Sequence, residues 1–147
     1  MNDKEFQLLV KAWEMYQNLA KGLGDSCWKI RSIAIGFWSA IIGYAYKEND
    51  VIPVYFAILI LAVFFFLETG TKRLQYKYIK KSLEVEISLN GILVGDEPNL
   101  PSSGITTNIE VPTFFELFDL FRLKRWMFWF PYLFLVAVSI IIIKYIV

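Results

Sequence analysis

Three long apolar segments constrain the fold of this chain more than any other feature of its sequence. They cover residues 28–46, 51–69 and 126–147. A helix needs about 20 mainly apolar residues to cross a bilayer, and each segment is close to that length. The first carries Lys29 and Arg31 near its start, so it can span only if these side chains extend toward the lipid head groups. We therefore predict an all-α membrane protein with three transmembrane helices in one domain, residues 1–147.

The overall composition agrees with a membrane protein and disfavours catalysis. Apolar residues make up 56% and aromatic residues 18% of the chain, more than in an average soluble domain. The chain has no histidine, which is the commonest general base and metal ligand, and it has a single cysteine. It also lacks a glycine-rich phosphate loop and any module that reads nucleic acid. We expect no enzymatic activity, no cofactor, no metal and no nucleic-acid partner.

Basic residues predict the orientation of the spans, because lysine and arginine accumulate in cytoplasmic segments. Between the first and second spans there is only Lys47, next to Glu48 and Asp50. The other three flanks are basic: Lys21, Lys29 and Arg31; Lys72, Arg73, Lys77, Lys80 and Lys81; and Arg122, Lys124 and Arg125. We predict a cytoplasmic N-terminus and a C-terminus outside, with the last two basic groups setting the topology and contacting membrane lipid head groups.

The polar parts of the sequence predict further helices on the cytoplasmic side. Residues 1–24 carry apolar side chains at helical spacing, so we expect an amphipathic helix that ends at Gly22 and Gly24. Residues 70–125 predict a helical extension of the second span, a loop at 91–112 and an interfacial helix before the third span. Strands are an open alternative within 84–111. The loop is long enough to serve as the contact site of a protein partner.

Glu68, in the stretch FFFLETGTKR, is the one carboxylate that borders a long apolar run. An acidic side chain within a span is a candidate for an ion path or a conformational switch. At the cytoplasmic end of the span, however, Glu68 can also pair with Lys72 one helical turn later and simply mark the membrane boundary. Its position favours this second interpretation. Burial between helices would favour the first.

Small residues form a stripe along the first span, where another helix can approach closely. The stripe consists of Ser32, Gly36, Ser39, Ala40 and Gly43. Residues at these spacings share one face of a helix, and small side chains on such a face permit close packing in a bilayer. The stripe predicts helix packing within the chain or homo-oligomerisation, and the sequence leaves both open.

The pattern CWKIRSIAIGFWSAIIGYAY, a short loop and then FFFLETGTKRLQYKYIKKSLEVEISLNG resembles small bacterial two-span effectors of the SLATT type. The resemblance covers about residues 27–91. It implies a bacterial inner-membrane protein that oligomerises and acts as a membrane-disrupting or pore-forming effector of an anti-phage or nucleotide-signalling system. At the level of residues it touches Glu68 and the helix that follows from Lys72 to Glu86. The third span and its aromatic approach, 114–129, depart from the two-span pattern.

Two functions therefore stand as hypotheses from the sequence. The first is an oligomeric effector of a bacterial defence or signalling system that perturbs the inner membrane or forms a pore. The second is a non-conducting scaffold or accessory subunit of a membrane complex. Few polar residues lie deep in the three spans, which is an argument against a preformed pore.

Overall fold

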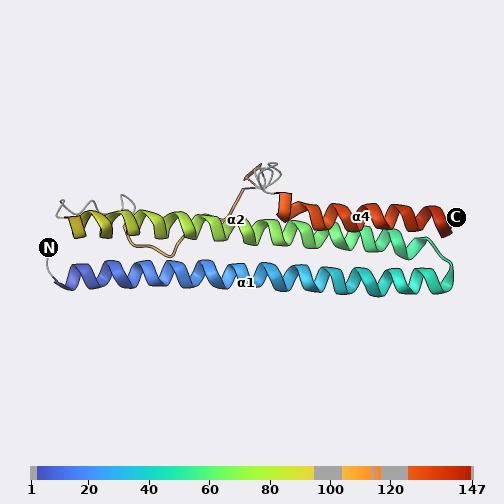
Figure 1. The fold of residues 1–147 in the computed structure, drawn as a ribbon, viewed down its shortest axis with the longest axis horizontal. Coiled ribbons are helices and arrows are strands. Elements are labelled where there is room, and N and C mark those ends of the chain that lie inside the picture. The colour runs from blue at the N-terminus through green and yellow to red at the C-terminus, as the bar shows by residue number, and fades with distance from the viewer. Residues whose placement is uncertain (1–2, 95–103, 114, 117–125, 147) are drawn as a thin grey trace. The chain divides into compact units, whose positions relative to one another are not determined.

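The computed structural model describes residues 3–94, 104–113, 115–116 and 126–146, and the described elements are three helices (Figure 1). They are α1 (Asp3–Glu48), α2 (Ile52–Val94) and α4 (Trp126–Ile146). No strand occurs in this part of the chain, which confirms the all-α prediction. The chain forms two compact units: a hairpin unit (Met1–Asp25 and Lys72–Pro112) and a three-helix unit (Ser26–Thr71 and Thr113–Val147).

In the three-helix unit, the second part of α1 and the first part of α2 run antiparallel, and α4 lies along α2 (Figure 1). A tight turn joins α1 to α2. Asn49 adopts a left-handed conformation with φ 54°, which asparagine tolerates better than most residues. The Asp50 side chain then accepts a hydrogen bond from the Ile52 N–H at 3.0 Å and caps the start of α2. The turn thus fixes which residues of α1 face which residues of α2.

In the three-helix unit many large apolar residues are exposed, while the buried set combines small and polar residues with a few larger apolar ones, Val54, Leu61, Phe128 and Tyr132. Buried positions include Ala34, Ala45, Ala57, Glu68, Thr69 and Ser139. Exposed positions include Phe37, Tyr44, Phe56, Leu59, Val63, Phe66, Met127, Phe134 and Ile140. A soluble protein places its large apolar side chains in the core instead, whereas small and polar interfaces are usual between helices in a bilayer.

Both α2 and α4 are long and apolar enough to cross a membrane. In their most apolar stretches, 33% and 17% of the residues, respectively, are buried. The first predicted span, 28–46, is helical as part of α1, but α1 is less apolar overall than the other two helices. The structure therefore provides two helices suited to crossing a bilayer.

In the hairpin unit, the first part of α1 packs along the second part of α2. Their contact contains the buried residues Leu9, Ala12, Tyr16 and Val85, with partly buried residues around them (Trp13, Met15, Tyr78, Leu89 and Ile92). The predicted apolar face of the N-terminal helix thus exists, and it packs against the extension of the second span. α2 is helical through Val94, so the strand alternative is wrong for residues 84–94.

The expected end of the first helix at Gly22 and Gly24 is wrong, because α1 continues through both glycines. A glycine inside a helix costs only about 1 kcal/mol relative to alanine, which packing against a neighbouring helix offsets. At Gly24 the missing side chain also makes room for Gln75, whose amide donates a hydrogen bond to the Ala20 carbonyl at 2.9 Å. A Cβ atom at Gly24 would lie 2.7 Å from that amide nitrogen.

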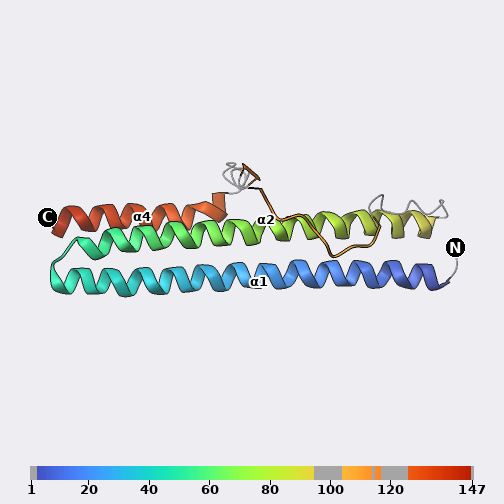
Figure 2. The same cartoon turned by 180° about the vertical axis from the view of Figure 1, so that it is seen from behind.

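Residues 104–112, here called the strap, run without regular secondary structure along the hairpin unit (Figure 2). They form the second half of the predicted loop 91–112, whose first residues, Gly91–Val94, are the end of α2. Before α4, Phe115 and Glu116 are helical. The rest of the predicted interfacial helix, residues 114 and 117–125, lies outside the described residues.

Gly22 and Gly24 offer a matched test of the hairpin packing. We expect Gly22→Ala to stabilise the protein by about 0.5–1 kcal/mol, because alanine favours the helix and no atom lies within 4 Å of the new Cβ. Gly24→Ala should gain little or nothing, because the same Cβ displaces the Gln75 amide and costs a hydrogen bond worth about 1 kcal/mol. Thermal unfolding in detergent, followed by circular dichroism, measures both. Equal stabilisation by the two substitutions would contradict the Gln75 contact.

Candidate functional site

Glu68 lies in the interior of the three-helix unit, with 1% of its surface exposed. Its carboxylate accepts hydrogen bonds from Arg31 of α1 at 2.5 Å and 3.3 Å, one to each oxygen. The Tyr132 hydroxyl of α4 donates a third hydrogen bond at 2.5 Å. Each of the three helices therefore contributes one side chain to a single polar cluster, Arg31–Glu68–Tyr132, which is our candidate functional site.

Besides Glu68, the Arg31 guanidinium contacts two aromatic rings and a backbone carbonyl. It lies 5.4 Å from the centre of the Trp28 ring and 5.9 Å from that of Phe128. It also donates to the Phe128 carbonyl at 3.5 Å. Cations over aromatic faces are stabilised more strongly when they are desolvated. Arg31 is thus held by a carboxylate, a carbonyl and two aromatic rings.

Neighbouring residues enclose the cluster. The Phe65 ring packs edge-on against Tyr132 at 5.2 Å and lies 5.8 Å from Phe128. The Cys27 thiol is buried and donates to the Glu68 carbonyl at 3.9 Å. The Thr69 hydroxyl turns back to the Phe65 carbonyl at 2.7 Å. Water has little access to the carboxylate, so Arg31 and Tyr132 provide the interactions that stabilise it in place of water.

A second polar link joins α1 and α4 about two helical turns further along both helices. The Trp38 indole N–H donates to the Ser139 hydroxyl at 2.8 Å, and that hydroxyl donates to the Leu135 carbonyl at 2.8 Å. Ala34, Leu61 and Tyr132 form the apolar layer near these links. The polar contacts at two levels therefore fix α4 against α1.

The cluster is one buried ion pair whose carboxylate also accepts a hydrogen bond from Tyr132. The described residues contain no group of three or more histidine, cysteine, aspartate or glutamate side chains that could hold a metal ion. The cluster pairs one positive with one negative charge, and the carboxylate is closed to its surroundings. A buried ion pair of this kind is costly to break, because each partner then remains as an uncompensated charge.

The predicted pairing of Glu68 with Lys72 is wrong. The Lys72 ammonium lies over the Tyr76 ring at 5.6 Å, and Arg31 pairs with Glu68 instead. The sequence did hold a signal for this pair. Arg31 and Glu68 are equally distant from the turn at Asn49–Asp50, and residues equidistant from a tight turn face each other in an antiparallel helix pair. Tyr132 had no comparable signal, because residues 95–125 separate α4 from the first two helices.

The small-residue stripe of α1 does not pack against other described parts of the chain. All five residues, Ser32, Gly36, Ser39, Ala40 and Gly43, are exposed. No atom lies within 4 Å of a Cβ built at Gly36 or Gly43. The hydroxyls of Ser32 and Ser39 bond to carbonyls of their own helix. The sequence left open whether the stripe packs within the chain or between copies. Within the described residues, the stripe does not pack against another helix of the same chain.

Several of the predicted head-group cations have partners inside the hairpin unit. Lys77 donates to the Glu110 carbonyl at 3.1 Å, and Lys81 pairs with Glu84 at 3.3 Å. Arg73 is partly buried, and Lys80 is exposed. Arg122, Lys124 and Arg125 lie outside the described residues. Of the basic residues after the second span, Lys80 thus has the clearest access to lipid.

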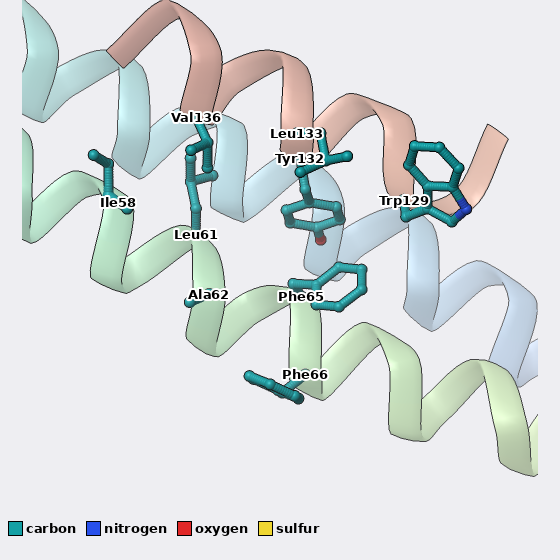
Figure 3. Close-up of a pocket in the computed structure, with 9 residues that line it drawn as sticks. All are labelled: Ile58, Leu61, Ala62, Phe65, Phe66, Trp129, Tyr132, Leu133 and Val136. Atoms are coloured by element: carbon teal, nitrogen blue, oxygen red, sulfur yellow. The ribbon is translucent and has the colours of Figure 1, made fainter. Parts of the chain in front are cut away.

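An apolar pocket of about 260 Å³ lies between α2 and α4 beside the cluster (Figure 3). In Figure 3 it is lined by Ile58, Leu61, Ala62, Phe65 and Phe66 of α2 and by Trp129, Tyr132, Leu133 and Val136 of α4. The one hydroxyl among these side chains, that of Tyr132, is already bonded to Glu68. The pocket therefore offers mainly hydrocarbon surface, and the indole N–H of its lining residue Trp129 is buried without a hydrogen-bond partner among the described residues.

Comparison of the chain with protein-family models, curated proteins and solved structures found no match.

The cluster can be tested by removing each partner. We expect Glu68→Ala to destabilise the protein by about 3–5 kcal/mol, because Arg31 then remains partly buried without its carboxylate. Lys72→Ala should change the stability by no more than about 0.5 kcal/mol, since Lys72 does not contact Glu68. The double replacement Arg31→Met with Glu68→Leu should recover most of the loss, because no unpaired charge remains. Thermal unfolding in detergent measures all three. Equal effects of Glu68→Ala and Lys72→Ala would refute the assignment.

Proposed function

We propose that the chain is a multi-pass protein of the bacterial inner membrane with three spans, in which residues 28–46 of α1 cross the bilayer together with α2 and α4. Two observations support the first span. This part of α1 contacts both other helices through Ala34 and Trp38, so it lies at the same depth as they do. It also exposes large apolar side chains, among them Ile33, Phe37 and Tyr44, as a lipid-facing helix does.

The proposed orientation places the N-terminus in the cytoplasm and the C-terminus outside. Three spans put residues 1–25 and 72–125 on one side of the membrane. The hairpin unit agrees with this, because its two helices come from those two segments and share one core. The basic residues that flank the spans then face the cytoplasm.

We further propose that the protein self-associates through the stripe on α1. The observation that carries this proposal is that five small residues lie exposed on one face. Among the described residues, nothing beyond the nearby backbone of α1 lies within 4 Å of a Cβ at Gly36 or Gly43. In a bilayer there is no hydrophobic gain in covering such a face, and close backbone packing against another helix is its main use. A second copy supplies a helix with the same stripe.

The biological role we propose is that of an effector of a bacterial defence or signalling system, which perturbs the inner membrane after assembly. The resemblance to SLATT-type effectors and the unpaired stripe support it. In this proposal the Arg31–Glu68–Tyr132 cluster holds the three helices together in the resting protein. When its hydrogen bonds break, α4 can separate from the other two helices. Glu68 then acts as a switch and does not line a path in the resting state, since 1% of its surface is exposed.

A non-conducting scaffold or accessory subunit is the second candidate function. The closed cluster favours it, because every charge that the described part of the three-helix unit holds inside is neutralised locally. A scaffold keeps this closed form permanently, and its stripe contacts a different protein. Purification in mild detergent separates the candidates: a homo-oligomer supports the effector, and a stoichiometric foreign partner supports the subunit.

The stripe can be tested without disturbing the fold of one copy. We expect Gly36→Leu to convert the oligomer to a monomer, because leucine keeps two backbones apart. The thermal stability of the monomer should not fall, since leucine favours the helix over glycine and no other described group lies within 4 Å of the new Cβ. Val63→Leu, on an exposed position of α2, is the matched control and should leave the oligomer intact. Light scattering in detergent measures the mass. An oligomer that persists in Gly36→Leu would rule out the stripe as its interface.

Membrane perturbation is measured with a potential-sensitive dye in bacteria that overproduce the protein. We expect depolarisation with the native sequence and with Val63→Leu, and a normal potential with Gly36→Leu at the same level of membrane-inserted protein. The physical reason is that perturbation requires assembled copies. A normal potential in cells whose membranes contain the oligomer would exclude the effector role and leave the scaffold.

A further inference from the structure

The apolar pocket between α2 and α4 is partly open to the surroundings of the three-helix unit (Figure 3). Among its lining residues, Leu61 and Tyr132 have only 1% and 6% of their surface exposed, whereas Phe66 and Leu133 have 48% and 55%. It is therefore a groove with a buried floor and an exposed rim. Its volume of about 260 Å³ exceeds the roughly 150 Å³ of a cavity that binds benzene, so it has room for a larger hydrocarbon group.

The two ends of this groove differ in chemistry. Trp129 lies at one end, and the aliphatic side chains of Ile58 and Val136 lie at the other (Figure 3). Along α4 the distance from Trp129 to Val136 is about 10 Å, at 1.5 Å per residue. In the proposed orientation α4 begins at the cytoplasmic side with Trp126. The Trp129 end then lies near the head groups, and the aliphatic end lies deeper in the bilayer.

Trp129 carries a hydrogen-bond donor that has no acceptor. Its indole nitrogen is buried and lacks a hydrogen-bond partner among the described residues. A buried indole N–H usually has a partner, because an unmade hydrogen bond leaves the cost of desolvating the donor uncompensated. An unpaired donor in the lining of an open apolar groove therefore indicates a ligand that combines one acceptor with a hydrocarbon chain.

We propose that the groove binds one acyl chain of a phospholipid from the cytoplasmic leaflet, with an ester carbonyl oxygen of that lipid accepting a hydrogen bond from the Trp129 indole. This inference rests on the proposed insertion into the membrane. A diacyl phospholipid fits because its acceptor lies at the head-group end of a hydrocarbon chain, which is the order that the groove presents from Trp129 to Val136. The bound chain contacts α2 and α4 together and so contributes to their packing.

The site is tested by photolabelling the full-length protein in nanodiscs of phosphatidylethanolamine and phosphatidylglycerol. A small fraction of the phosphatidylethanolamine carries a photoreactive diazirine on one acyl chain. Lipid around the protein labels any exposed residue, so the informative positions are Leu61 and Tyr132 on the buried floor. We expect label on both. Ala62→Phe, which places a ring in the groove, should reduce it by about fivefold or more. Val63→Phe, at the next and exposed position outside the lining, is the matched control and should leave it unchanged.

A second pair of variants tests the hydrogen bond and keeps the aromatic ring. We expect Trp129→Phe to weaken labelling of the floor by about threefold to tenfold, the change in affinity that corresponds to one ordinary hydrogen bond. Trp126→Phe, an exposed tryptophan outside the lining, should have no effect. Circular dichroism shows whether each variant is folded. If Ala62→Phe does not fold, the two tryptophan variants decide the result.

Extraction of the same membranes with carbonate separates this inference from the proposed function. Membrane-inserted protein that is labelled only at exposed residues would overturn the lipid site and leave insertion standing. A groove covered by a second copy gives this result together with an oligomer, and it overturns the lipid site as well. Label on the floor that folded Ala62→Phe or Trp129→Phe does not reduce would also overturn it. Protein that carbonate releases from the membrane would overturn both proposals.

Discussion

The ion pair between Arg31 and Glu68 is the interaction on which the three-helix unit depends. A carboxylate cannot remain ionised in an apolar interior unless a cation and hydrogen-bond donors surround it. Arg31 meets this need only in one register of the α1–α2 pair, and the turn at Asn49 sets that register. Tyr132 then ties α4 to the same carboxylate. One buried charge therefore specifies how three helices lie together, in a surrounding where apolar side chains alone discriminate poorly between registers.

The distribution of side chains between the surface and the interior of the three-helix unit is the one expected of helices surrounded by lipid. Many large apolar side chains face outward, while alanines, Ser139 and the polar cluster lie inside together with Val54, Leu61 and Phe128. The stripe of small residues on α1 differs from the rest of this surface, because small side chains offer lipid little to contact. The proposals of membrane insertion and of self-association rest on these two features of the surface.

The hairpin unit uses different contacts. Its helices share an ordinary apolar core, and tyrosine hydroxyls at the rim of that core hold the strap by its backbone. Lys77, which the sequence suggested as a head-group contact, donates a hydrogen bond to the Glu110 carbonyl of the strap. The two units therefore combine a tight, charge-specified contact among three helices with a loosely attached segment that precedes α4 in the chain.

The sequence by itself determined the helices, because the apolar runs and their spacing decide which residues leave water whatever the packing. The apolar face containing Leu9 and Tyr16 was also readable, although its partner was not. Gly22 and Gly24 led to the wrong prediction that the first helix ends there. The free-energy cost of a glycine within a helix is smaller than the packing energy of a long helix. The partner of Glu68 was decided by tertiary structure: Lys72 is closer in sequence, but the antiparallel turn brings Arg31 to the carboxylate and α4 adds Tyr132. The strap contacts were beyond sequence reasoning for a related reason. They join backbone atoms of residues 106–110 to side chains far away in the chain, and backbone atoms carry no sequence signal.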